Sequence, residues 1–194
     1  MIWFSVHTAD ITDAAYAQLY ADLSPSRKAR VDRQKQADAR RRTLAGEWLM
    51  RRWLDENGLC AVRPASAENG RPYLPATAWH VSVAHCDELV VCAVSEAPVG
   101  IDVERIRPID LKLARRVCVE EELIYLFGRT PTADDYVWCE DPDILTRFFE
   151  IWTAKEAHFK RCGTGITTLQ SVNILPLKRQ IFHQNGFLIQ IIDE

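Results

Sequence analysis

The sequence has no hydrophobic run that approaches the roughly 18 residues a membrane-spanning helix needs. Its first ten residues carry no basic segment and reach Asp10 too early for a secretory signal peptide. The net charge of −3 gives no general attraction to nucleic acid or to an anionic membrane. We therefore expect a cytoplasmic protein without a membrane or nucleic-acid partner.

Zinc-binding cysteine pairs are also absent. None of the six cysteines has C-x2-C spacing, and the five histidines complete no zinc-finger pattern, so a structural zinc site is not expected. Without an export signal, reduced thiols are the expected state. These cysteines are Cys60, Cys86, Cys92, Cys118, Cys139 and Cys162.

Apolar periodicity predicts a mixture of helices and strands, and 194 residues suffice for one large domain or two small ones. Before Pro98, which marks the expected boundary between residues 1–97 and 98–194, we expect strands at 2–6, 80–86 and 89–94 and helices at 13–23 and 38–57. After it, we expect strands at 99–104, 172–175 and 187–192, helices within 111–127 and at 148–160, and a polar loop at 128–143.

Two carboxylates share one face of the strand expected at 99–104, VGIDVE. Successive strand side chains alternate between faces, so Asp102 and Glu104 point the same way. Carboxylates this close repel each other unless a cation or a proton lies between them. An isolated pair of this kind is more often the solvated face of an edge strand.

The helix expected at 148–160, FFEIWTAKEAHFK, places Trp152, Lys155, Glu156 and Phe159 along one broad side. Taken alone, it is an amphipathic helix with a surface Glu–Lys pair. Taken together with Asp102 and Glu104, Glu156 would complete three oxygen ligands for a hard cation such as Mg2+.

The pair VGIDVE and, about fifty residues later, WTAKEAHFK resembles the signature of the 4′-phosphopantetheinyl transferases, in particular their long, Sfp-like class. The resemblance implies an α+β fold of two similar halves with pseudo-two-fold symmetry, each a small antiparallel sheet packed with a long helix. The first half would bind the coenzyme A nucleotide, and the second would hold the metal and the catalytic helix.

The same resemblance extends to residues that bind coenzyme A in the family. SPSRKAR and RRTLAGEWL match segments that hold its 3′-phosphate, which implies that role for Arg27, Arg30 and Arg42. NGRPYL resembles the G-K-P segment through Arg71. SVAHC keeps the motif histidine as His85, a phosphate contact, but has Ala84 and Cys86 where the family has serines.

By resemblance, the activity is Mg-dependent transfer of 4′-phosphopantetheine from coenzyme A to a serine of an acyl or peptidyl carrier protein, with adenosine 3′,5′-bisphosphate released. Such an enzyme is a holo-[acyl-carrier-protein] synthase, and Mn2+ is an alternative metal. Asp102, Glu104 and Glu156 would bind the metal. Lys155 and Lys160 would place positive charge at the phosphates, and Glu122 or Glu156 would act as general base, with Glu121 adjacent to Glu122.

One departure from the family is the C-terminus, where Sfp-like proteins usually continue. We expect a shortened second half whose sheet lacks one or two strands. The family implies a monomer, and a dimer is expected if the open edge of this sheet pairs with another copy. Which carrier protein is served stays open.

Three other hypotheses remain at the level of sequence. The basic segment 27–52 could bind nucleic acid, although the acidic balance of the whole chain argues against this. A D…E-x-K nuclease fits poorly, because Arg105 and Ile106 follow Glu104 and Lys155 precedes Glu156. A family member without activity is the third.

Overall fold

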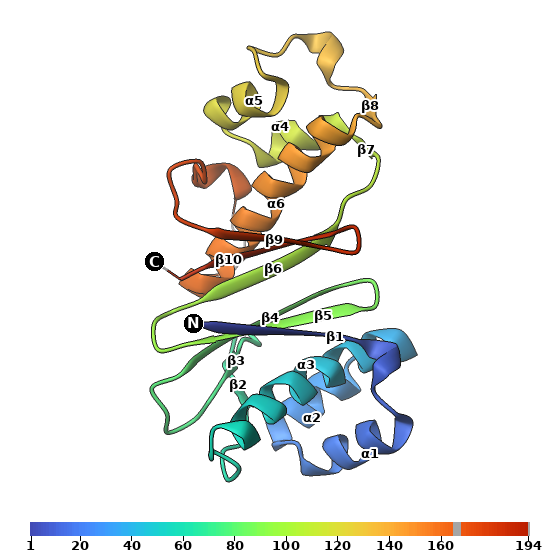
Figure 1. Cartoon of the computed structure of the whole chain (residues 1–194), viewed down its shortest axis with the longest axis vertical. Coiled ribbons are helices and arrows are strands. Elements are labelled where there is room, and N and C mark those ends of the chain that lie inside the picture. Colours follow the sequence, from blue (N-terminus) through green and yellow to red (C-terminus); the bar gives the residue numbers. More distant parts are fainter. Residues whose placement is uncertain (165–167, 194) are drawn as a thin grey trace.

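The computed structural model describes residues 1–164 and 168–193 and shows an α+β protein with two small antiparallel sheets at its centre (Figure 1). Helices cover the outer face of each sheet, so the chain forms four layers, helix–sheet–sheet–helix. Among the described residues, no helix is both long enough and apolar enough to cross a membrane.

The first sheet has the strand order β1-β5-β4. Its long helix is α3, whose side chains Leu49 and Trp53 pack against the outer face of the sheet. The elements of this part are β1 (Ile2–His7), α1 (Asp13–Asp22), α2 (Pro25–Asp32), α3 (Ala37–Glu56), β2 (Ala65–Ser66), β3 (Pro72–Tyr73), β4 (His80–Cys86) and β5 (Leu89–Ser95).

The second sheet has the strand order β6-β10-β9, and α6 lies across its outer face (Figure 1). The elements of this part are β6 (Gly100–Arg105), β7 (Ile109–Asp110), α4 (Ala114–Val117), α5 (Glu120–Phe127), β8 (Trp138–Cys139), α6 (Pro142–Cys162), β9 (Gln180–Gln184) and β10 (Phe187–Ile192). The helix α6 begins at an Asp141 cap and ends at Gly163, which has a left-handed backbone.

The expected strand at 172–175 is wrong. The backbone N–H of Ile174 donates to the Glu122 carboxylate, and the backbone N–H of Leu175 donates to the Asn173 side chain. These N–H groups are therefore not available to pair with a neighbouring strand. The third strand is β9, which was not expected. Among the residues that the structure describes, the second sheet therefore has three strands, like the first, and the expectation that it lacks strands is also wrong.

Both faces of β5 are buried, which explains its continuous apolar sequence, LVVCAVS. Val90, Cys92 and Val94 face the helix layer, whereas Val91 and Ala93 face the other sheet. Both faces of β10 are buried in the same way. The space between the two sheets is thus a third apolar core, and it brings β4 next to β6.

Candidate functional site

The site is built where α6 crosses β6. On β6, Ile101 and Val103 point into the core between the sheets, so Gly100, Asp102 and Glu104 point toward α6. A Cβ atom on Gly100 would collide with the carbonyl oxygen of Ala157 in α6. The absence of a side chain at Gly100 therefore allows the strand and the helix to approach closely.

This close approach pairs a carboxylate with a lysine. Lys160 Nζ donates to Asp102 Oδ1 at 2.6 Å, while the buried Asp102 Oδ2 has no hydrogen-bond partner. Burial raises the pKa of Asp102 to about 6, against the lowering effect of Lys160. A buried carboxylate with one unsatisfied oxygen is a site with unused capacity for a cation.

Glu156 stands beside this pair. Desolvation, followed by the negative charge of Asp102, raises the pKa of Glu156 to about 7, and Glu104 contributes in the same direction. The structure therefore brings Asp102, Glu104 and Glu156 within electrostatic reach of one another. Glu104 itself accepts hydrogen bonds from Cys86 Sγ at 3.6 Å and from Arg107 Nη1 at 3.2 Å.

The donor chemistry of these carboxylates fits a hard divalent cation. Their mutual repulsion and the unsatisfied Asp102 oxygen are both relieved by a positive ion. No three His, Cys, Asp or Glu side chains in the described part of the chain form a ready-made group that could hold a metal. In this arrangement the Lys160 ammonium group supplies the neutralising charge next to Asp102.

Two adjoining cavities lie next to these carboxylates. One of about 300 Å3 is lined by Arg30, Arg71, Glu156 and Lys160, among others. The second, of about 220 Å3, is strongly cationic, and it shares Arg30 and Lys160 with the first. Its lining includes Arg27, Arg30, Arg42, Thr43, Ala84, His85 and Lys160. Lys160 therefore stands between the carboxylates and a basic cavity.

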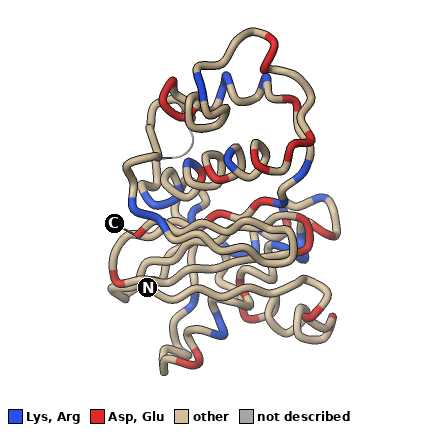
Figure 2. The backbone as a smooth tube through the Cα atoms, turned by 45° about the horizontal axis from the view of Figure 1, so that its top comes forward, with Lys and Arg blue, Asp and Glu red and all other residues tan. Residues whose placement is uncertain are grey.

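Positive charge outweighs negative charge in the lining of this cavity, whereas the two are mixed over the rest of the molecule. Figure 2 shows Lys and Arg interspersed with Asp and Glu over helices and loops, while the central strands carry few of either. Desolvation, then the charges of Arg42 and Lys160, lower the pKa of His85, although part of this residue stays exposed. The cavity can thus attract an anion such as a phosphate group.

The arginines of this region differ in how many of their donors are already used by other residues. Arg27 is buried and forms an ion pair with Glu47, so its charge is already compensated. Arg30 donates to the Gly70 carbonyl at 3.2 Å. Among the residues that the structure describes, Arg42 forms no side-chain hydrogen bond or ion pair. It lies half-buried in the cavity wall and is the arginine best placed to meet a ligand.

Arg71 joins the two parts of the chain. Its guanidinium donates to the carbonyl oxygen of Arg161 at 3.3 Å and to that of Val99 at 3.5 Å. Next to it, Asn69 Nδ2 donates to the Gly163 carbonyl at 3.0 Å. The loop before β3 is therefore fastened to the end of α6, where Asn69, Arg71 and Gly163 line the larger cavity.

A family model described as the 4′-phosphopantetheinyl transferase superfamily matches residues 98–190. The 4′-phosphopantetheinyl transferase HetI of Nostoc sp. is 30% identical over 177 residues, which cover 85% of this chain and 70% of that relative. The chain belongs to this superfamily. It is also 28% identical over 150 residues to the 4′-phosphopantetheinyl transferase Sfp of Bacillus subtilis, which supports the Sfp-like class.

The 4′-phosphopantetheinyl transferase gsp of Aneurinibacillus migulanus is 36% identical over 132 residues, 64% of this chain. The matched part spans 49% of the length of gsp and 62% of the length of Sfp. The chain thus covers about half to under two thirds of these two superfamily relatives.

Within this superfamily motif, the two neighbours Lys155 and Glu156 point in different directions. Glu156 lines the larger cavity, whereas Lys155 is completely buried and paired with Glu122. The structure therefore does not bring Lys155 and Glu122 to the carboxylates or to the cavities. The physical reason is helical geometry, because consecutive residues on a helix point about 100° apart.

Three features of the site were missed at the level of sequence. The close approach at Gly100 has a local signal, since glycine directly precedes the Ile-Asp pair of the motif. The contacts of Arg107 and Cys86 with Glu104 have weaker signals: Arg107 lies three residues after Glu104, and Cys86 replaces a motif serine.

Proposed function

We propose that this protein transfers the 4′-phosphopantetheine group of coenzyme A to a serine of an acyl or peptidyl carrier protein and releases adenosine 3′,5′-bisphosphate. The observation that carries the proposal is the position of Lys160. It links a cationic cavity of about 220 Å3 to a group of three carboxylates on β6 and α6. One chain supplies all of these residues, so the reaction needs no second copy.

The cationic cavity would hold the nucleotide end of coenzyme A. Arg30, Arg42 and His85 line it, and guanidinium groups suit phosphate oxygens. Arg71 lines the neighbouring cavity. Binding of this distant end fixes the pyrophosphate next to Lys160 and so raises the effective concentration of the reacting group.

Asp102, Glu104 and Glu156 would hold Mg2+, or Mn2+ in its place. When bound, the metal offsets charge on the pyrophosphate and on the leaving phosphate. Lys160 would contribute a second positive charge at the same phosphates.

In the transfer, the serine oxygen forms a bond to the phosphorus that carries the pantetheine arm. The bond from that phosphorus to the bridging oxygen of the pyrophosphate breaks, and adenosine 3′,5′-bisphosphate leaves with the bridging oxygen. The serine proton would pass to Glu156, the carboxylate of this group that lines the larger cavity. Glu122 is not assigned this role, because its buried carboxylate does not line either cavity.

We further propose that residues 1–97 and 98–194 are halves related by a pseudo-two-fold axis. In each, the sheet order is first strand, last strand, penultimate strand: β1-β5-β4 and β6-β10-β9. The contact between β4 and β6 has a counterpart between β1 and β9, where the rings of Trp3 and Phe182 lie 4.8 Å apart.

The six free cysteines are compatible with the reducing cytoplasm.

The first experiment is mass spectrometry of an apo carrier protein incubated with this protein, coenzyme A and Mg2+. We expect the carrier to gain the mass of one phosphopantetheine group, and EDTA to prevent the gain. Several carriers from fatty-acid, polyketide and nonribosomal peptide pathways should be tried. No gain on any of them, with coenzyme A nonetheless bound, would contradict the proposed activity.

Replacing Arg42 by alanine should raise the KM for coenzyme A roughly tenfold and leave kcat nearly unchanged. The reason is that Arg42 would bind a part of coenzyme A that takes no part in bond breaking, and a charged hydrogen bond contributes about 1.5–3 kcal/mol. Steady-state kinetics at varied coenzyme A measures this. Arg52→Ala, on the same helix but in a surface pair with Glu56, is the control. An unchanged KM in Arg42→Ala would argue against the cationic cavity as the nucleotide site.

A further inference from the structure

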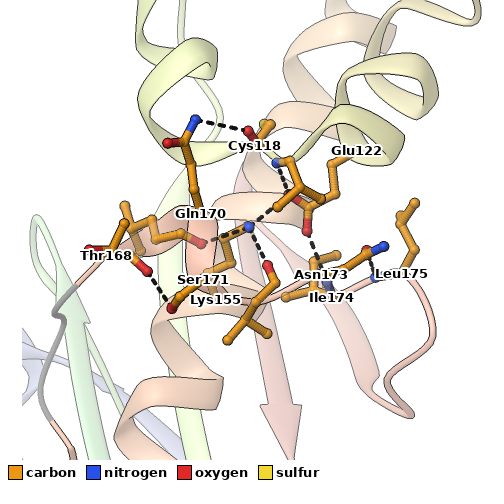
Figure 3. A network of polar contacts seen from close by, with 12 residues as sticks. Cys118, Glu122, Lys155, Thr168, Gln170, Ser171, Asn173, Ile174 and Leu175 are labelled. Carbon is orange, nitrogen blue, oxygen red and sulfur yellow. Dashed lines mark hydrogen bonds and ion pairs between the residues drawn. The ribbon is translucent and has the colours of Figure 1, made fainter.

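Lys155 and Glu122 form an ion pair in the interior of the second half. Both side chains are 0% exposed, and Lys155 Nζ lies 2.7 Å from Glu122 Oε2. Figure 3 shows them at the centre of a polar network between α5, α6 and the segment that precedes β9. A buried lysine and a buried glutamate are rare unless they are paired.

Every hydrogen-bonding position of the lysine is used. Besides Glu122, its ammonium group donates to the carbonyl oxygen of Leu169 at 2.8 Å and to that of Val172 at 2.6 Å. A lysine ammonium group has three N–H donors and no more. Lys155 therefore has no donor left for a phosphate group.

The glutamate is used just as fully. Glu122 Oε1 accepts from the backbone N–H of Ile174 at 2.8 Å, and Oε2 accepts from that of Val119 at 2.9 Å in addition to Lys155. Its carboxylate thus closes the first turn of α5 and fixes Ile174, which is itself buried. Glu122 has no free oxygen that faces a substrate.

The network connects parts of the chain that are far apart in sequence. The segment 168–175 is held to α6 through Lys155, to α5 through Glu122 and to α4 through Gln170, whose amide donates to the carbonyl oxygen of Cys118 at 3.3 Å (Figure 3). The pair therefore lies where α6, α5 and the segment 168–175 meet.

We propose that Lys155 and Glu122 are positioning residues: together they fix the rotation of α6, so that Glu156 points to Asp102. Because consecutive helical residues point about 100° apart, a Lys155 side chain held in the interior directs Glu156 toward β6. Neither Lys155 nor Glu122 touches coenzyme A or the carrier. The role of Glu156 that they serve rests on the proposed function.

Buried ion pairs have a characteristic response to mutation. Removing one partner leaves an uncompensated charge in the interior, whereas removing both charges together is often tolerated. A positioning pair is thus rescued by the second substitution, and a phosphate-binding lysine is not. This difference separates the two roles of Lys155.

The test compares Lys155→Met, Glu122→Gln and the double variant with the wild-type protein. Each is measured for melting temperature, Mn2+ affinity by calorimetry, and KM and kcat for coenzyme A. We expect Lys155→Met to melt about 10 °C lower. It should also bind Mn2+ at least threefold more weakly and lose kcat about tenfold, with KM for coenzyme A within twofold of wild type. The double variant should recover most of each loss.

Lys160→Met is the matched control, because the same change is made further along α6 at a residue that lines both cavities. It should raise the KM for coenzyme A, and Glu122→Gln should not rescue it. If the double variant instead keeps a raised KM for coenzyme A, Lys155 is a phosphate ligand and the proposal is overturned. Independent, additive losses of melting temperature would overturn it as well.

The outcome stays separate from that of the proposed function. A wild-type protein that transfers nothing to any carrier would overturn the transfer activity alone. Melting temperature and Mn2+ affinity of the same variants would still decide whether Lys155 and Glu122 position α6.

Discussion

Replacing Asp102 by asparagine is expected to reduce transfer by roughly a thousandfold or more and to remove the response to Mg2+. The change keeps the shape of the side chain and deletes only its charge. Asp102 holds the one buried carboxylate oxygen of this group that has no partner, and it is the residue to which Lys160 is paired. A neutral amide at this position attracts a divalent cation far less strongly than a carboxylate does.

The fold should survive this change. Lys160 is 31% exposed on its side chain, so its ammonium group can turn to water when Asp102 loses its charge. Circular dichroism and the melting temperature would verify this. Asp55→Asn, in a surface pair with Arg51 on α3, removes the same charge far from the site and should leave the rate unchanged.

Mn2+ affinity in the absence of coenzyme A is the most direct measurement of the metal assignment. We expect it to fall with the rate in Asp102→Asn, and to fall also in Glu156→Gln. Transfer at the wild-type rate in Asp102→Asn would refute the role of this carboxylate, whatever the metal affinity.

Adding one methyl group in Gly100→Ala should have the second large effect, a loss of about 3 kcal/mol or more in the free energy of unfolding, together with a loss of activity. The new Cβ would meet the backbone of α6, at the carbonyl of Ala157 and 2.7 Å from the amide nitrogen of Arg161. The hydrogen-bonded backbone of a helix cannot shift as easily as a side chain can. The strand and α6 must separate, and this carries Asp102 away from Glu156.

Gly46→Ala is the matched control, because a Cβ there would lie 2.9 Å from a methyl group of Val83, a side chain that can shift. Alanine also raises helix propensity in α3 by about 1 kcal/mol, which offsets part of the contact. Urea denaturation of both variants measures the difference. A Gly100→Ala protein that is as stable and active as Gly46→Ala would show that the close approach does not matter.

The parts of the fold and site that depend on local periodicity could be predicted from the sequence. Strand alternation predicted that Asp102 and Glu104 share a face, and the structure confirms that both point toward α6. In the first half, β1, α1, α3, β4 and β5 were likewise predicted to within a few residues, whereas α2, β2 and β3 were not. These features follow from backbone geometry, which each short segment determines by itself.

Features that depend on distant partners could not be predicted in this way. Lys155 and Glu156 are adjacent polar residues, and only the packing of α5 and of segment 168–175 decides which of them is buried. Arg27 was expected to meet a phosphate, and its partner Glu47 lies twenty residues away on another helix. The segment 172–175 has strand-like composition, but the side chains of Glu122 and Asn173 use its N–H groups.

The loop that carries Asn69 and Arg71 has a mechanical consequence. It fastens the first half to the end of α6 beside the larger cavity, and residues of both halves line that cavity. A molecule that fills this space would add contacts between the two halves, which already pack through the core between the sheets and are joined along the chain by residues 96–99. A filled cavity would then hold the two halves together more firmly. A protease would cleave residues 96–99 more slowly when the cavity is occupied.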